Sequence, residues 1–144
     1  MQRYYSYKYY LNASHSFDGL PSHAHAHTFT ITLCIQVLES GFVSFMDVDK
    51  RIEQYFASFS GKYLNQVPEL NDMNPTVENL GDYYFETLHE RLSPYHFELM
   101  QLEIMETPLR CYCVSNSLLI PSARRKENAK IWDHVIDRKM KLFQ

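Results

Sequence analysis

The chain has 144 residues, enough for one domain with a substantial core, and its composition of 45% hydrophobic and 15% aromatic residues excludes a disordered or fibrous protein. Three cysteines without a Cys-x-x-Cys pair suggest neither a disulfide framework nor a thiolate zinc site. The net charge is −3, although residues 122–144 hold seven lysines and arginines against three acidic residues.

Alternating patterns predict strands in the first third of the chain. In residues 4–13, Tyr5, Tyr7 and Tyr9 alternate with polar residues, as in a half-buried strand. Residues 27–37 alternate more clearly and predict a second strand. A turn at 39–41 precedes a third predicted strand at 42–46.

Two helices and two further strands are predicted next. Apolar residues at helical spacing predict a helix from residue 47 to about residue 60. Asn74 and Pro75, a capping residue followed by a proline at the first helical position, predict a second helix that ends near Leu92. Strands are predicted at 97–106 and 110–119. Helices between antiparallel strands indicate an α+β fold with both helices on one face of the sheet.

The basic C-terminal segment predicts a docked helix. Its apolar residues Ile131, Trp132, Val135 and Ile136 fall at helical spacing, which favours a helix with a solvated basic face over a nucleic-acid-binding tail. We expect one domain, with a core unit at 1–121 and this helical extension at 122–144. The sequence has neither a signal-peptide core nor about 20 consecutive apolar residues, so we expect a cytoplasmic protein without a membrane span.

Four histidines lie close together in the sequence. His25 and His27 are two residues apart and share one face of a strand, with His23 in line behind them. If the intervening loop folds back, His15 faces this pair from a neighbouring strand. Three neutral imidazoles with a fourth position open are typical of a catalytic zinc site, whereas the alternative is a solvated strand that carries several histidines.

An acidic residue continues the apolar face of the strand at 97–106. Met100, Leu102 and Ile104 share that face, and the next member of the series is Glu106. A buried carboxylate needs donors, which an amino-pyrimidine edge with two adjacent N–H groups supplies. The alternative is an exposed acid at the end of the strand.

These motifs, in this order, resemble the 6-pyruvoyl-tetrahydropterin synthase and 6-carboxytetrahydropterin synthase family. The resemblance covers about residues 3–118. It rests on Ala13-Ser14-His15, His25-Ala26-His27, Tyr63-Leu64-Asn65, Asn74-Pro75-Thr76-Val77-Glu78-Asn79-Leu80 and Glu103-Ile104-Met105-Glu106-Thr107.

The resemblance implies a site and an assembly. His15, His25 and His27 would bind Zn²⁺, and Glu106 would anchor a pterin ring. The implied fold is the tunnelling fold, a small antiparallel sheet with two helices on one side. The implied assembly is a trimer stacked into a hexamer, with sites between subunits, which would also protect the sheet edges.

The sequence departs from the family pattern at its acid-base residues. Pro21 occupies the position of the usual cysteine, four residues before His25, and Ser60 and Gly61 replace the usual Asp-His pair. Losing such groups commonly costs on the order of 10²–10⁴ in rate each. His23 is the nearest candidate for a replacement base.

Three functions follow as hypotheses. The first is a zinc-dependent lyase acting on a dihydroneopterin triphosphate-type or related pterin by a modified mechanism. The second is a non-catalytic pterin-binding or assembly protein that keeps the fold and the metal. The third is a nucleic-acid-binding protein that uses the basic tail, with steep salt dependence. Cys111 and Cys113 share a strand face, and we expect them to be apolar fillers rather than a relocated nucleophile.

Overall fold

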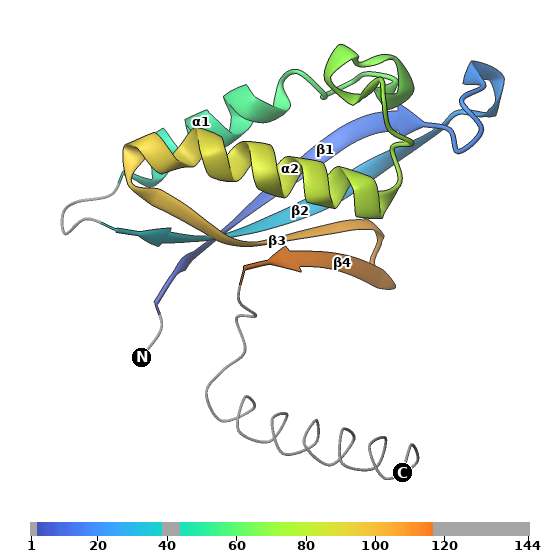
Figure 1. Ribbon diagram of the computed structural model, residues 1–144. Helices are drawn as coiled ribbons and strands as arrows, with labels where there is room; N and C mark the ends of the chain where they lie inside the picture. Colours follow the sequence, from blue (N-terminus) through green and yellow to red (C-terminus); the bar gives the residue numbers. More distant parts are fainter. Residues whose placement is uncertain (1–2, 39–43, 117–144) are drawn as a thin grey trace, which may run out of the picture.

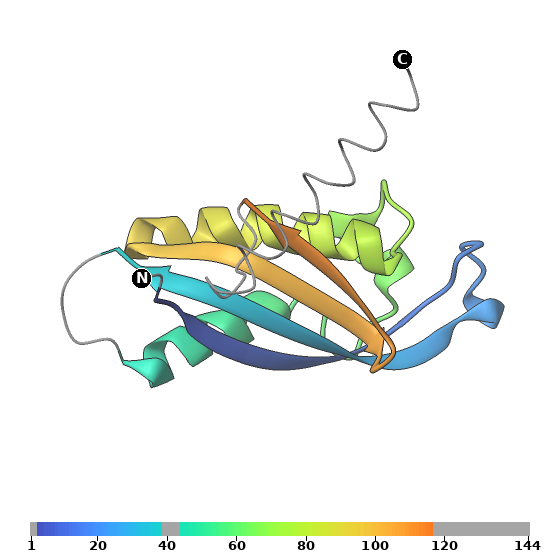
Figure 2. The ribbon, with the colours of Figure 1, turned by 90° about the horizontal axis from the view of Figure 1, so that it is seen from below.

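The computed structural model describes residues 3–38 and 44–116. The strands in these residues form one antiparallel sheet in the order β1-β2-β3-β4. The strands are β1 (Tyr5–His15), β2 (His25–Val37), β3 (Phe97–Thr107) and β4 (Arg110–Ser115). The helices α1 (Phe45–Phe56) and α2 (Val77–Leu92) both cover the same face of the sheet, and the opposite face carries neither helix (Figures 1 and 2). The predicted α+β architecture is therefore confirmed.

The first two strands pair without interruption. Their register runs from Tyr5 opposite Ile35 to His15 opposite His25. Leu11 and Phe29 are partners in this ladder, and both are fully buried beneath the helices. Every second residue of β1 and β2 therefore faces the core, and the same alternation turns the histidines at the strand ends toward the helix side.

A bulge interrupts the pairing of β2 with β3. Cys34 pairs with Gln101 but Ile35 pairs with Leu99, so Met100 is an extra residue in β3. The bulge reverses the alternation, and Leu99 takes the fully buried position while Met100 is half-buried. The prediction that Met100 shares the buried face of Leu102 is therefore wrong.

Helix α1 begins earlier than its apolar pattern indicates. Ser44 is the N-cap, and its hydroxyl accepts a hydrogen bond from the backbone N–H of Asp47 at 3.4 Å. A capped helix from Phe45 leaves no strand at 44–46, so the predicted third strand is wrong over the residues that the structure describes. The core side chains of α1 are Val48, Ile52, Tyr55 and Phe56.

Helix α2 packs closely on the last two strands. Its N-cap is Thr76, whose hydroxyl accepts from the Asn79 N–H at 3.2 Å, and not the predicted Asn74. A Cβ atom on Gly81 would lie 2.7 Å from Cδ1 of Tyr112, so only a glycine permits this approach of helix and strand. The hydroxyl of Tyr112 in turn donates to Asp82 at 2.7 Å, which fixes the ring beneath the helix.

The remaining expectations concern the end of the chain. Strand β4 ends at Ser115, and both the rest of the predicted strand to residue 119 and the predicted helix at 122–144 lie outside the described residues. In the described part of the chain, neither helix combines the length and apolar character needed to cross a bilayer.

Candidate metal centre and adjoining pocket

The ends of β1 and β2 bring three imidazoles together. His15 and His25 are direct partners in the ladder, and His27 follows His25 on the same strand face. The ring centroids lie 4.6 Å apart for His15 and His25, 5.2 Å for His15 and His27, and 4.8 Å for His25 and His27. One nitrogen of each ring lies within 4.8 Å of the others, as a shared metal ion requires.

His15 is the most constrained member of this triad. It is 0% exposed, and its ring lies edge-to-face with that of Phe29 at 5.5 Å. Its Nδ1 lies 2.6 Å from the carbonyl oxygen of Pro75. Because a carbonyl only accepts, Nδ1 donates this hydrogen bond, and Nε2 is the nitrogen that remains for the site.

Three buried polar atoms at this place have no hydrogen-bond partner. They are Nε2 of His15, Nε2 of His27 and Oε1 of Glu106. The first and the last are only 3.1 Å apart, which would bring a lone pair against a carboxylate. A cation held by the three imidazoles would give both Nε2 atoms a partner, and imidazoles with a carboxylate nearby fit zinc.

The environment of His27 favours the neutral form that binds a metal. Desolvation lowers the pKa of His27 from its usual value of 6.5, and the charge of Glu106 opposes this only in part. Glu106 lies near the end of β3 with 23% of its side chain exposed. It therefore reaches the triad with one oxygen while staying accessible to a ligand.

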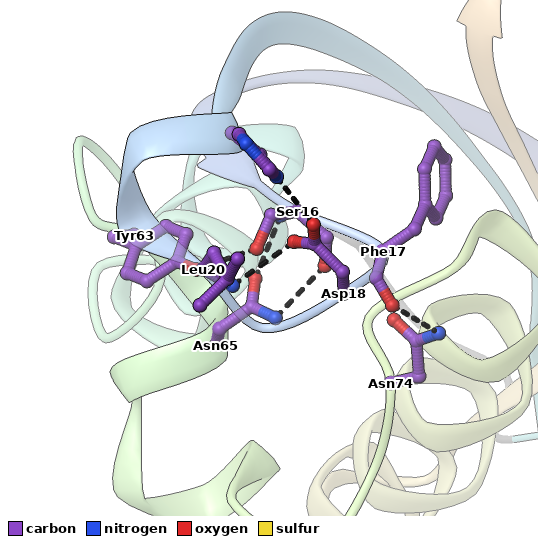
Figure 3. Close-up of polar contacts among 8 residues, drawn as sticks. Ser16, Phe17, Asp18, Leu20, Tyr63, Asn65 and Asn74 are labelled. Atoms are coloured by element: carbon purple, nitrogen blue, oxygen red, sulfur yellow. Dashed lines mark hydrogen bonds and ion pairs between the residues drawn. The ribbon is translucent and has the colours of Figure 1, made fainter.

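The loop that follows His15 is fixed by side chains from the segment between the helices (Figure 3). Asn65 makes two hydrogen bonds of 2.9 Å with Ser16, accepting from its N–H and donating to its carbonyl. The Ser16 hydroxyl lies 2.6 Å from the hydroxyl of Tyr63, and Asn74 donates to the carbonyl of Phe17 at 3.2 Å. These bonds determine where β1 ends and thereby where His15 lies. The resemblance places Asn65 in a family motif but implies no role for it.

His23 does not continue the strand face of the triad. It ends the 3₁₀ turn Pro21–His23, and β2 begins only at His25. Its Nδ1 forms a very short contact with the carboxylate of Asp18, and its side chain is 62% exposed. The prediction that His23 lies in line with His25 and His27 is wrong. It assumed that the strand extends back to His23, whereas Pro21 starts a turn there.

Gly61 has a backbone role in the turn beside β1. Its φ of 72° is left-handed, and its N–H donates to the carbonyl of Asn12 at 2.6 Å. Beside it, the N–H of Ser14 donates to the carbonyl of Lys62 at 3.0 Å. This segment therefore covers the outer edge of β1 beside the triad with backbone groups alone.

A pocket of about 570 Å³ opens next to the triad. Glu106, Thr107 and Arg110 line it from the β3-β4 hairpin, and Glu78 lines it from the first turn of α2. Phe17 contributes an apolar wall from the loop after β1. The pocket thus combines a partly buried carboxylate, a cation and an aromatic ring, a mixture typical of a site for a small polar ligand.

Comparison with known proteins gives a consistent fold. The profile of a family described as 6-pyruvoyl tetrahydropterin synthase matches residues 4–117. The 6-pyruvoyl tetrahydropterin synthase of Caenorhabditis elegans superposes with a TM-score of 0.65 at 20% identity, over 80% of this chain and 96% of that one. The enzyme of the same name from Plasmodium falciparum gives 0.54 at 12% identity, over 81% and 98%.

An uncharacterized protein from Wolinella succinogenes is also similar, with a TM-score of 0.61 at 12% identity over 80% of this chain and 98% of that one. A comparison with curated proteins finds no significant match. At these identities the superpositions show the fold, which is the predicted tunnelling fold.

Proposed function

We propose, because this chain belongs to the 6-pyruvoyl tetrahydropterin synthase family, that it is a zinc-dependent lyase acting on a dihydroneopterin triphosphate-type or related pterin. One observation carries the proposal: unpartnered buried atoms of His15 and Glu106 lie 3.1 Å apart, and His27, whose Nε2 is also buried and unpartnered, belongs to the same cluster of imidazoles. Buried polar atoms are rarely left without partners, so such a convergence is typical of a site completed by a ligand.

Glu106 is the proposed anchor for the pterin ring. A carboxylate accepts two parallel hydrogen bonds from the amino-pyrimidine edge, and this arrangement fixes both the position and the orientation of a flat ring. The adjoining pocket, about 570 Å³, is within the usual range of about 300–1,000 Å³ for small-molecule sites. Phe17 would then cover an apolar part of the ligand.

The imidazoles of His15, His25 and His27 would hold the zinc ion. Zinc bound there supplies Lewis-acid polarisation of an oxygen on the ligand side chain. The Pro75 carbonyl keeps the proton of His15 on Nδ1, so that Nε2 stays directed into the site. Phe17 and Phe29 flank the His15 ring and limit the access of water to it.

We propose His23 as the group that moves protons, with Asp18 as its positioning residue. The Asp18 carboxylate holds Nδ1 of His23, so that the other ring nitrogen is available to exchange a proton. The hydrogen bond from His23 also lowers the pKa of Asp18, which keeps this carboxyl charged. This pair offers the residue types that Ser60 and Gly61 no longer supply.

The alternative is a pterin-binding protein without catalysis. It is favoured by Gly61, whose left-handed backbone serves the turn and whose position offers no side chain for proton transfer. Substituting Asp18 by asparagine and His23 by alanine separates the two functions. If the protein is an enzyme that uses the pair, both variants lose turnover and the pH dependence of the remaining turnover changes, while pterin affinity stays the same. If it is a binding protein, neither the wild type nor the variants show turnover.

The first experiment is metal analysis of untagged protein beside the His15→Ala variant, followed by calorimetric titration of the zinc-loaded protein with a pterin panel. We expect the variant to lose one equivalent of zinc relative to the wild type. Glu106→Gln is the matched test of the anchor: we expect it to keep the metal and lose pterin affinity by at least about tenfold. Zinc content equal in wild type and His15→Ala would contradict the proposed site.

The proposed assembly is a trimer or a hexamer. Within the described residues the sheet has free edges at β1 and β4, apart from the short bridge between Ser14 and Tyr63. Exposed strand edges are commonly protected by pairing with other strands. Light scattering coupled to size-exclusion chromatography measures the mass directly, and a monomer would contradict this part of the proposal.

A further inference from the structure

A second pocket, of about 400 Å³, lies between α1 and the end of α2. It is lined by two arginines, one amide and three largely apolar side chains: Arg51, Gln54, Arg91, Leu92, Pro94 and Tyr95. The end of α2 and the end of β1, where the triad begins, lie at opposite ends of the molecule (Figures 1 and 2). This pocket also shares no lining residue with the one that contains Glu106, so the two are separate sites.

The lining of this pocket carries two positive charges and no negative one, although the net charge of the chain is −3. In residues 3–38 and 44–116 both ion pairs are formed by histidines, so neither Arg51 nor Arg91 pairs with a carboxylate there. Arg91 also borders the neighbouring pocket, which contains Glu69 and Glu90, but it lies within ion-pair distance of neither. Both guanidinium groups are therefore available to an anion.

Aromatic rings hold both arginines in place. The guanidinium carbon of Arg51 lies 3.5 Å from the ring centroid of Tyr95, and that of Arg91 lies 5.7 Å from the ring centroid of Tyr55. The Tyr55 ring is fixed in turn, because it is buried and its hydroxyl bonds to Thr87. Stacking occupies the flat face of a guanidinium group and leaves the N–H donors at its edge free for oxygen acceptors. Arg51 in particular is thus oriented before a ligand binds.

The C-terminal end of α2 opposes an anion only in part. A helix end of this kind carries the equivalent of about half a negative charge on its last carbonyl groups. One of these carbonyls, that of His89, accepts a hydrogen bond from the N–H of Ser93, and Arg91 itself lies in the last turn. Against this partial charge stand two full positive charges, so the pocket remains positive.

We propose that this pocket binds a diphosphate group, with Arg51 and Arg91 each contacting one phosphate and Gln54 donating a further hydrogen bond. Guanidinium groups bind phosphate oxygens through two parallel N–H donors, and two such groups suit a ligand with two adjacent anionic centres. The volume is within the usual range of about 300–1,000 Å³ for small-molecule sites. The group is supplied by free pyrophosphate or by a nucleoside diphosphate whose base packs against Leu92 and Pro94. This site does not depend on the pterin chemistry proposed above.

Calorimetric titration of the full-length protein with sodium pyrophosphate tests the proposal. We expect a binding event that weakens at least about tenfold in Arg51→Gln and in Arg91→Gln. Orthophosphate, which reaches only one guanidinium group at a time, should bind at least about tenfold more weakly than pyrophosphate. Heat from chelation of a bound metal is common to all variants, so the difference between them reports the pocket.

Arg110→Gln, in the pocket that contains Glu106, is the matched control. It should keep the pyrophosphate event, whereas Arg51→Gln should keep pterin binding. Arg51→Lys retains the charge without the planar fork and should recover part of the loss. Because Arg91 is exposed, Arg91→Gln tests the site even if the lost contact with Tyr95 destabilises Arg51→Gln.

Titration with ADP identifies the source of the group. An affinity for ADP above that for pyrophosphate indicates a nucleotide, and an equal or lower one indicates the free anion. Pyrophosphate affinity that is the same in wild type, Arg51→Gln and Arg91→Gln would overturn the proposal. Loss of the event in Arg110→Gln alone would also overturn it, because the anion would then occupy the pocket of Glu106.

Discussion

Asn65 holds Ser16 by both of its backbone polar groups, with two hydrogen bonds of 2.9 Å. Ser16 is fully buried and directly follows His15. One side chain from the segment between the helices therefore fixes the end of the strand that carries a metal ligand. This relationship connects an amide distant in sequence to the geometry of the triad.

Replacing Asn65 by alanine should lower both stability and zinc affinity. The change leaves two buried backbone groups of Ser16 without partners, which costs on the order of 1–3 kcal/mol for each unsatisfied group unless water enters. Urea unfolding and competitive zinc titration measure the two effects. Gln66→Ala, at an exposed neighbouring position, is the control. Zinc affinity unchanged in Asn65→Ala would show that the clamp does not position His15.

Replacing Gly81 by alanine should destabilise the protein. Although alanine is the better helix former by about 1 kcal/mol, its Cβ would lie 2.7 Å from the Tyr112 ring, and overpacking of this kind costs about 1–3 kcal/mol. Thermal unfolding measures the difference. Tyr112→Leu in the same background should recover part of the loss, and an increase in melting temperature for Gly81→Ala alone would contradict the clash.

The stability of the metal-free protein should fall at acidic pH in a way that depends on His27. Desolvation lowers the pKa of His27 from 6.5, so the unfolded chain binds more protons than the folded one just below that pH. His27 therefore supports the fold fully above about pH 6.5, and this contribution decreases as the pH falls toward the lower folded pKa. Urea unfolding of wild type and His27→Gln between pH 8 and 5 measures the difference, and parallel curves would argue against the effect.

Replacing Arg110 by glutamine should weaken binding of phosphorylated pterins selectively. Arg110 is a cation of the pocket that contains Glu106, and a hydrogen bond to a charged group contributes about 1.5–3 kcal/mol. We expect at least about a tenfold loss of affinity for a triphosphate-bearing pterin and a small change for the unphosphorylated compound. Calorimetry with both ligands makes the comparison, with Arg51→Gln as a control distant from the pocket. Equal losses for the two ligands would exclude a phosphate-binding role.

The sequence predicted the triad because its signal is local. His25 and His27 are two apart on a strand, and the hairpin register then brings His15 opposite His25. The same alternation failed at Met100, because a bulge inserts one residue and nothing in the neighbouring residues indicates it. It failed again at His23, where Pro21 starts a turn instead of extending the strand.

The supporting contacts of the site could not be predicted in this way. The hydrogen bond from His15 to the Pro75 carbonyl joins residues 60 positions apart, and that from Ser16 to Asn65 joins residues 49 apart. Such contacts depend on how the helices pack on the sheet and not on local pattern. At Ser44 the local signal was present, a serine three residues before Asp47, but the apolar residues that follow it read as a strand.

The acceptor that sets the proton position on His15 is a main-chain carbonyl. Every amino acid supplies that group, so substitution at residue 75 cannot delete it while the local backbone keeps its course. Side chains used for chemistry, by contrast, are lost by single substitutions. The orientation of this ligand is therefore buffered against mutation, and a lineage that abandons one reaction still inherits a histidine poised to bind metal, a starting point from which a new activity can evolve.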